Sequence, residues 1–462
     1  MTESITANPQ AAARLERLPI SGYHKLIFII IALAFFFDSV DLGMMTFVLG
    51  SIKTEFGLST EAAGLLASMS FVGMVLGAAV SGMLADRFGR KPVFQVSMII
   101  WGVASFMCST ADNATTLGLW RLLLGIGMGM EFPVAQTLMS EFILAKARGK
   151  YVALMDGFWP LGFITAGLLS YYVLSFYNWR TVFALLAIPA LFLLVVRRFI
   201  PESPRWLEHV GRNEEAEATL QKIESKVKAS LKVSTLPEPV WLTSTRSTGS
   251  TSSTTKGNSF MALWTPQYRM RTIMVWGLWF FALLGYYGLT TWLSALLQQG
   301  GFAVTKSVMY TVLISLGGIP GFITAAILVE KWGRKPTCIA ALLGGAVMAF
   351  LYGKSAMSGH ENMLIATGLC MQFFLFGMWA VLYTYTPELY GTGSRATGSG
   401  FASAIGRVGS LLGPYAVGVV LPTWGQGGVF TVGALCFVVA AILVAVLGIE
   451  TRGLALEELS TN

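Results

Sequence analysis

The sequence predicts an all-α membrane protein with twelve transmembrane helices in two pseudo-symmetric six-helix halves. The 462 residues are 54% hydrophobic and only 12% charged, with a mean hydropathy of +0.65. Ordinary soluble domains carry about 25% charged residues. Apolar runs long enough to cross a bilayer recur along the chain, and short charged motifs recur between its two halves. These observations together predict the fold class.

The apolar runs divide into two sets of six. The first set covers residues 26–49, 61–84, 93–110, 116–141, 151–175 and 181–199, and the second covers residues 270–297, 306–329, 337–356, 362–386, 397–420 and 428–448. The predicted organisation is therefore an N-terminal half (1–199), a cytoplasmic linker (200–268) and a C-terminal half (269–462). Within the linker, charged and amphipathic residues 206–231 predict short helices, and Ser/Thr-rich residues 243–256 predict a flexible stretch.

Lysine and arginine predict the orientation of the chain, because cytoplasmic loops carry an excess of both. With the N-terminus inside, the outer loops hold only the basic residues Lys53, Arg180, Lys306 and Lys354, and the other loop lysines and arginines lie on the inner side. Both termini are then cytoplasmic, and a bacterial inner membrane is the expected location. The net charge of +8 is explained by this topology rather than by nucleic-acid binding.

Charged motifs repeat between the halves at a nearly constant offset. Residues 86–92 (Asp-Arg-Phe-Gly-Arg-Lys-Pro) follow the second run, and residues 330–336 (Glu-Lys-Trp-Gly-Arg-Lys-Pro) follow the eighth. Glu141 and Arg148 recur as Glu388 and Arg395, and residues 201–205 (Pro-Glu-Ser-Pro-Arg) have a weaker echo that begins at Glu450. Internal repeats of this kind are typical of secondary transporters.

These motifs resemble those of the major facilitator superfamily over nearly the whole chain. Residues 82–91 resemble its loop between spans two and three, and residues 121–129 resemble its span-four motif. Asp38-Ser39-Val40-Asp41 resembles the paired aspartates of the aromatic-acid/proton symporters, and residues 129–133 (Gly-Met-Glu-Phe-Pro) resemble the metabolite and organic-ion branch, which includes nicotinate transporters. Residues 201–207 and 387–390 are also similar to sugar porters and organic-ion transporters.

The resemblance implies a network of charge pairs that closes the inner side when the binding site faces outward. It assigns this gating role to eight residues in the two halves: Asp86, Arg90, Glu141, Arg148, Glu330, Arg334, Glu388 and Arg395. The alternative for all eight is a purely topogenic loop charge.

Two charged residues are expected to meet near the outer third of the membrane. At about 1.5 Å rise per residue, Asp41 lies about 22 Å from the inner end of its span and Arg121 about 7 Å from the outer end of the fourth. The two therefore share a level in a core about 30 Å thick, and the pair matches that of proton-coupled sugar porters. A neighbouring arginine favours the charged carboxylate, and separation of the pair favours the protonated one. The expected role is proton coupling.

Two further carboxylates are candidates near this pair. Asp38 lies one turn deeper than Asp41, near the midplane, and is a second proton site or a substrate contact. Glu131 lies nearer the cytoplasmic side and either relays protons or bonds a neighbouring helix as a neutral acid. Intramembrane carboxylates are costly, which makes both functional candidates; an interhelical hydrogen bond from a protonated Asp is the structural alternative.

Substrate binding is predicted around Arg407, in the middle of the eleventh run. A guanidinium this deep is costly and suits a carboxylate ligand; a structural pair with Asp38 or with a backbone carbonyl is the alternative. Resemblance to organic-anion transporters supports a substrate role. In that superfamily spans one, four, seven and ten line the central cavity, which adds candidates for contact with a flat substrate: Tyr286, Tyr287, Gln372 and Trp379.

The predicted function is proton-coupled uptake of a small organic acid, such as nicotinate or a benzoate, by alternating access. A proton-coupled sugar or polyol porter and an organic-cation or drug exporter are the alternatives. The four cysteines have unrelated spacings and predict no metal or redox site, and no nucleophile–base spacing predicts an enzyme. The expected partners are the substrate, protons and the lipid bilayer, with no other cofactor, and the expected unit is a monomer.

Overall fold

The computed structural model describes residues 10–143, 151, 154–155, 157–192, 195, 199–238, 261, 263–358, 360–390 and 395–452. Every regular element among these residues is a helix, so the all-α class is confirmed. The Ser/Thr-rich stretch 243–256 lies outside the described residues. Ten stretches are long and apolar enough to cross a membrane, and the last of them, Gly398–Leu447, has 50 residues and can cross twice.

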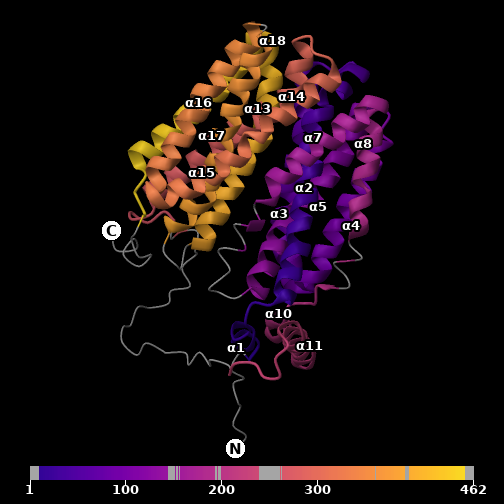
Figure 1. The fold of residues 1–462 in the computed structure, drawn as a ribbon, viewed down its shortest axis with the longest axis vertical. Helices are drawn as coiled ribbons and strands as arrows, with labels where there is room; N and C mark the ends of the chain where they lie inside the picture. Colours follow the sequence, from indigo (N-terminus) through magenta and orange to yellow (C-terminus); the bar gives the residue numbers. More distant parts are fainter. Residues whose placement is uncertain are drawn as a thin grey trace, which may run out of the picture.

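The N-terminal half is coloured indigo to magenta in Figure 1 and packs as one bundle. Its helices are α2 (Gly22–Glu55), α3 (Thr60–Phe88), α4 (Arg90–Ser109), α5 (Ala114–Phe142), α7 (Phe158–Phe176) and α8 (Trp179–Leu186), followed by the 3-10 turn η1 (Ile188–Phe192). α3 packs on α5, α5 on α4, and α2 on α7. The sixth predicted span thus begins as α8 and η1.

The C-terminal half forms the orange to yellow bundle beside it. Its helices are α13 (Arg269–Gln299), α14 (Val304–Leu316), α15 (Gly318–Lys331), α16 (Arg334–Ser358), α17 (Glu361–Glu388) and α18 (Arg395–Leu447). α18 covers both final predicted spans, and its backbone is broken at Gly425 (φ 65°, ψ −172°). A positive φ of this kind suits glycine, so the chain reverses there between the two spans.

Short polar side chains fix where several helices begin. Ser59, Asn113 and Asn178 precede α3, α5 and α8, and each accepts a hydrogen bond from the backbone N–H three residues later, at 3.1, 2.9 and 3.2 Å. These are N-caps, which satisfy N–H groups that have no partner within the helix. They lie at the ends of the bundle, where the apolar runs stop.

The two copies of the repeated loop share a glycine with a similar positive φ. Gly89 and Gly333 have φ of 102° and 115°, a region that side chains with a Cβ rarely adopt. An added Cβ would meet the carboxylate of Glu202 at 2.2 Å in the first half and that of Glu450 at 2.5 Å in the second. The sequence repeat is therefore also a structural repeat, with equivalent glutamates returning from the end of each half.

A small helical cap covers the inner end of the N-terminal half, at the bottom of Figure 1. It consists of α1 (Gln10–Glu16), α10 (Pro204–His209) and α11 (Asn213–Leu231). Arg14 and Arg17 form ion pairs with Glu224 at 2.9 and 2.7 Å, which ties the N-terminal helix to α11. Burial opposes ionisation of Glu224, but the hydrogen bonds from both arginines lower its pKa. We call this end of the molecule the inner end because the sequence predicts it to be cytoplasmic.

The two halves pack against each other at the opposite, outer end and diverge toward the inner end (Figure 1). α3 packs on α18, α2 on α13, and α7 on α14. Ser68 donates a hydrogen bond to the carbonyl of Leu411 at 2.7 Å, and the Tyr415 hydroxyl donates to Glu61 at 3.2 Å. The structure is therefore closed at its outer end.

Close packing of α3 on α18 depends on a residue without a side chain. A Cβ on Gly418 would lie 2.8 Å from the carbonyl oxygen of Thr60. We expect Gly418→Leu to open the outer end, because overpacking costs about 1–3 kcal/mol and so raises the outward-open population about tenfold or more. The measurement is labelling of a Thr290→Cys side chain, 3% exposed here on α13, by an impermeant maleimide in a Cys370→Ser background.

The matched control is Gly400→Leu in the same helix, because nothing lies within 4 Å of a Cβ added at Gly400. Labelling should rise in Gly418→Leu alone. Equal labelling of both variants would contradict a closed outer end.

Candidate functional site

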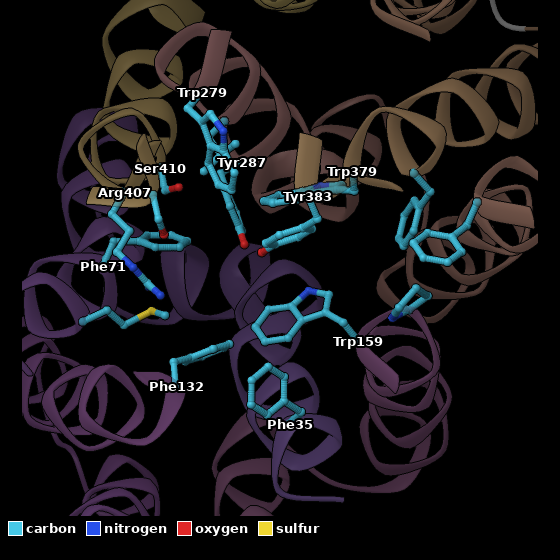
Figure 2. A pocket seen from close by; sticks show the side chains of 16 residues that line it. Phe35, Phe71, Phe132, Trp159, Trp279, Tyr287, Trp379, Tyr383, Arg407 and Ser410 are labelled. Carbon is cyan, nitrogen blue, oxygen red and sulfur yellow. The ribbon is translucent and has the colours of Figure 1, made fainter. Parts of the chain in front are cut away.

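A central cavity lies between the two halves (Figure 2), with about 800 Å³ of space counted out to its open side. Sixteen residues from both halves line it: Phe35, Phe71, Met74, Phe132, Trp159, Pro160, Trp279, Leu283, Tyr287, Phe322, Phe376, Trp379, Tyr383, Ser403, Arg407 and Ser410. Ligand pockets are usually apolar with a few placed polar groups. This lining, with one cation among aromatic rings, has that character.

Aromatic rings of α13 and α17 form one wall of the cavity. Trp379 and Tyr383, one turn apart on α17, stack with ring centroids 5.6 Å apart, and Trp279 contacts Tyr383 edge-on at 5.5 Å. Figure 2 shows the hydroxyls of Tyr287 and Tyr383 directed toward each other at the cavity surface. Flat faces combined with two hydroxyls suit a small aromatic ligand.

Arg407 is the cationic group of the cavity. Its guanidinium lies 5.3 Å from the ring centroid of Phe132, in the opposite half, and points into the open space in Figure 2. No carboxylate of the described residues forms an ion pair with it, although it interacts electrostatically with Asp38. A guanidinium in this position has donors to offer a carboxylate ligand.

Two serines share the face of α18 that carries Arg407. Ser403, Arg407 and Ser410 are spaced by four and three residues, and all three line the cavity. This spacing places them on one helical face, so the serines could have been found from the sequence once Arg407 was chosen. Ser410 donates to the backbone carbonyl of Gly406 at 3.1 Å, so its lone pairs remain as acceptors.

The structure brings Asp41 and Arg121 together as the helix depths predict. Arg121 Nη1 donates to Asp41 Oδ1 at 3.0 Å, and both side chains are 0% exposed. Ser105 and Trp101 of α4 lie near the Asp41 carboxylate. The pair is a fully buried ion pair, whose partners depend on each other because either one alone would leave an uncompensated charge.

Asp38 and Glu131 lie outside the lining of the cavity. They are 1% and 2% exposed, whereas Phe35 and Phe132 reach the cavity and pack edge-on with ring centroids 4.7 Å apart. Asp38 nevertheless interacts electrostatically with Glu131, Asp41 and Arg407. Asp38 is therefore linked electrostatically both to the Asp41–Arg121 pair and to Arg407 of the cavity.

Only two of the four aromatic and amide residues predicted to contact a substrate line the cavity. Tyr287 and Trp379 line the cavity, whereas Tyr286 packs against Trp379 at 5.4 Å and lines a smaller neighbouring pocket. Gln372 is fully buried away from both, and its amide atoms have no hydrogen-bond partner among the described residues. A direct contact between Gln372 and a ligand thus needs a different arrangement of α17.

Several lining residues were missed because they come from helices that sequence reasoning did not expect at the cavity. Phe71 and Met74 come from α3, Trp159 from α7 and Phe322 from α15. Helices that are apolar on all sides carry no periodic signal for the face that meets the other half.

The inner-end charges form one network inside each half. Arg90 lies 3.5 Å from Glu141, and Arg334 lies 2.9 Å from Glu388 and 3.2 Å from Glu330. Arg148 lies outside the described residues, and the side chains of Asp86 and Arg395 lie outside what the structure describes. Each of these ion pairs joins two residues of the same half.

Two glutamates for which the sequence predicted no role also bind these inner-end loops. Glu202 accepts hydrogen bonds from the backbone N–H groups of Arg90 and Lys91 at 3.1 and 3.2 Å. Glu450 accepts from those of Arg334 and Lys335 at 2.9 and 3.1 Å. Each carboxylate caps the helix that follows the repeated loop, where the helix dipole favours negative charge. Burial raises the pKa of Glu202 despite these donors.

Comparison with known proteins agrees with the repeated loops and the central cavity. The family described as "Sugar (and other) transporter" matches residues 25–462. This chain belongs to that family of the major facilitator superfamily. It is a transporter rather than an enzyme. The crystal structure of a D-xylose–proton symporter superposes with a TM-score of 0.71 at 19% identity, covering 94% of this chain and all of the other, which shows the twelve-helix fold.

Two relatives with related names match nearly the full length of the chain. The niacin transporter NiaP of Acinetobacter baylyi is 35% identical over 97% of this chain and 99% of its own. The 4-hydroxybenzoate transporter PcaK of the same organism is 29% identical over 89% of this chain and 88% of its own. Both names refer to small aromatic compounds.

The inner-end network makes a testable distinction between two partners of Arg334. Glu388 is 23% exposed and also accepts from Thr451 at 2.6 Å, whereas Glu330 is 69% exposed. We expect Glu388→Gln to lower the free energy of unfolding in detergent by about 1–3 kcal/mol, because a charged hydrogen-bonded group is lost. The measurement is the melting temperature, which should fall. Glu330→Gln is the control, since exposed pairs contribute about 0–1 kcal/mol. Equal melting temperatures for the two variants would contradict this ranking.

Proposed function

We propose that this transporter imports a small aromatic monocarboxylate, such as nicotinate or a benzoate, together with protons. The observation that carries the proposal is the cavity, where Arg407 lies among aromatic rings without an ion-pair partner among the described residues. The guanidinium would bind the carboxylate, and Trp279, Trp379 and Tyr383 would contact the ring. Names of full-length relatives, a niacin and a 4-hydroxybenzoate transporter, support the same substrate class.

Proton coupling is proposed at the Asp41–Arg121 pair. Both side chains are fully buried, with Arg121 Nη1 3.0 Å from Asp41 Oδ1. A proton on Asp41 would neutralise its carboxylate and leave Arg121 as an unpaired charge. The ionised pair is neutral overall, whereas the protonated form leaves a buried positive charge that needs another compensating group. A substrate-driven rearrangement that separates the two groups would take up or release a proton.

The transport cycle is proposed to be alternating access by one chain. The outer end is closed here by contacts between α3 and α18, so the present state would release substrate on the inner side. In the opposite state the inner-end motifs of the two halves would approach each other. The network of Arg90, Glu141, Arg334 and Glu388 and the undescribed side chains of Asp86, Arg148 and Arg395 would then close the inner end.

The orientation proposed for this cycle places both termini in the cytoplasm of a bacterial inner membrane. The basis is the excess of lysine and arginine at the end that carries α1, α10 and α11. With this orientation the closed outer end faces the periplasm.

The alternatives fit the cavity less well. An organic cation would have to lie beside Arg407, which repels it, because Asp38 and Glu131 do not line the cavity. A sugar or polyol needs many hydrogen bonds, and the cavity offers Ser403, Ser410 and two tyrosine hydroxyls. Neither alternative uses the positive charge of the guanidinium.

The substrate class is tested by ligand binding to purified protein with nicotinate, benzoate, their neutral amides, sugars and organic cations. Nicotinate or benzoate should bind, and Arg407→Ala should weaken binding at least about tenfold, since hydrogen bonds to charged groups contribute about 1.5–3 kcal/mol. Arg407→Lys is the charge-preserving control and should retain part of the affinity. Stabilisation by sugars alone, or unchanged acid affinity in Arg407→Ala, would overturn the assignment.

Proton coupling is tested with Asp41→Asn in proteoliposomes. This variant should lose accumulation driven by a pH gradient, because the carboxyl that binds the proton is gone, and should retain exchange of labelled for unlabelled substrate. Asp112→Asn, at an exposed loop position, is the control and should behave as the wild type. Accumulation at the wild-type level in Asp41→Asn would contradict the proposal.

A further inference from the structure

A second pocket adjoins the cavity on its outer side. It is the smaller of the two spaces in this state, in which the outer end is closed. Its lining includes Ser39 and Thr46 of α2, and Thr290 and Thr291 of α13. α2 runs outward from the inner end, so these α2 residues lie further out than Phe35 of the cavity. We call this space the outer pocket.

Three aromatic residues separate the outer pocket from the cavity. Phe71, Trp159 and Tyr287 line both spaces. Phe71 comes from the N-terminal half and Tyr287 from the C-terminal half, and their rings meet edge-on with centroids 4.7 Å apart. A ligand that moves from the outer end toward Arg407 would have to pass between the rings of Phe71 and Tyr287.

The basic group of the outer pocket is Arg121. Its side chain is 0% exposed, its guanidinium lies 5.7 Å from the ring centroid of Phe183, and Nη1 donates a hydrogen bond to Asp41. Nε and Nη2 have no hydrogen-bond partner among the described residues. A guanidinium has five N–H donors, and buried donors are normally satisfied. The unsatisfied edge of Arg121 thus points to an acceptor that the described residues do not supply.

The charge balance decides when an anion can use that edge. With Asp41 ionised, the buried pair is neutral, and an added carboxylate would leave an uncompensated negative charge in an apolar interior. With Asp41 protonated, Arg121 keeps its positive charge, and a substrate carboxylate restores neutrality. One proton on Asp41 therefore balances one carboxylate at Arg121.

We propose that Arg121 is a second carboxylate-binding residue, which holds the substrate in the outer pocket while Asp41 is protonated, before Arg407 receives it in the cavity. The inference rests on the proposed function and adds the reason for coupling. Substrate carboxylate and the Asp41 carboxylate compete for one guanidinium, so proton binding and substrate binding promote each other. When the substrate has moved on to Arg407 and the outer end has closed, Asp41 releases its proton toward the inner side and pairs with Arg121 again.

Several other groups lie around Asp41, and a test of its protonation must distinguish it from them. Trp101, Ser105 and Cys108 of α4 face it, and Asp38 on its own helix interacts with it. Tyr286 and Tyr287 of α13 line the same pocket as Arg121. Asp38 in turn interacts with Glu131 and Arg407. A control at Glu131 therefore distinguishes titration of Asp41 from titration of Glu131.

The test measures benzoate and benzamide binding by calorimetry after the cavity site is removed. At about pH 8, where benzoate is ionised, Asp41→Asn/Arg407→Ala should bind benzoate at least about tenfold more tightly than Arg407→Ala, because Arg121 is released. Benzamide, which lacks the charge, should bind both variants equally. Equal benzoate affinity in the two variants would overturn the inference.

A second arm avoids any change at Asp41. In Arg407→Ala, benzoate affinity should rise between about pH 8 and about pH 6. Arg121→Gln in that background should abolish the rise, whereas Glu131→Gln should preserve it; a rise that survives Arg121→Gln, or is lost in Glu131→Gln, contradicts the inference. Wild-type protein that binds neither benzoate nor nicotinate overturns the proposed function itself, and the inference with it.

Discussion

The structure depends on how two arginines inside a membrane-embedded bundle are neutralised. A guanidinium in an apolar interior is costly unless a partner compensates its charge. Arg121 has such a partner in Asp41 at 3.0 Å. Arg407 lies in the cavity against Phe132 without an ion pair to the described residues. This difference separates the proposed coupling site, whose charge is balanced within one half, from the proposed binding site, where a substrate carboxylate would balance the charge.

The repeated halves provide the rigid frame around these two charges. Glu202 and Glu450 cap equivalent helices after Gly89 and Gly333, so each half fixes its own inner end by the same backbone-to-carboxylate contacts. Contacts between halves are made instead at the outer end, by α3 on α18. A structure with rigid halves and a separable interface is suited to rocking about a central site.

The sequence was sufficient for the fold and for part of the site. Depth along a helix follows from a rise of about 1.5 Å per residue, which is why the meeting of Asp41 and Arg121 could be predicted. The direction of a side chain could not be read in the same way from helices that are apolar on every face. For this reason the sequence did not predict that Gln372 lies away from the cavity. It also did not predict that Trp159 and Phe322, from two other helices, line it.

The most direct test of the account is an experimental structure of the protein with bound nicotinate or benzoate. The account predicts carboxylate oxygens about 3 Å from the Arg407 guanidinium, with the ring against Trp379 and Tyr383. A carboxylate directed away from both Arg407 and Arg121, or a ring bound outside the central cavity, would contradict it.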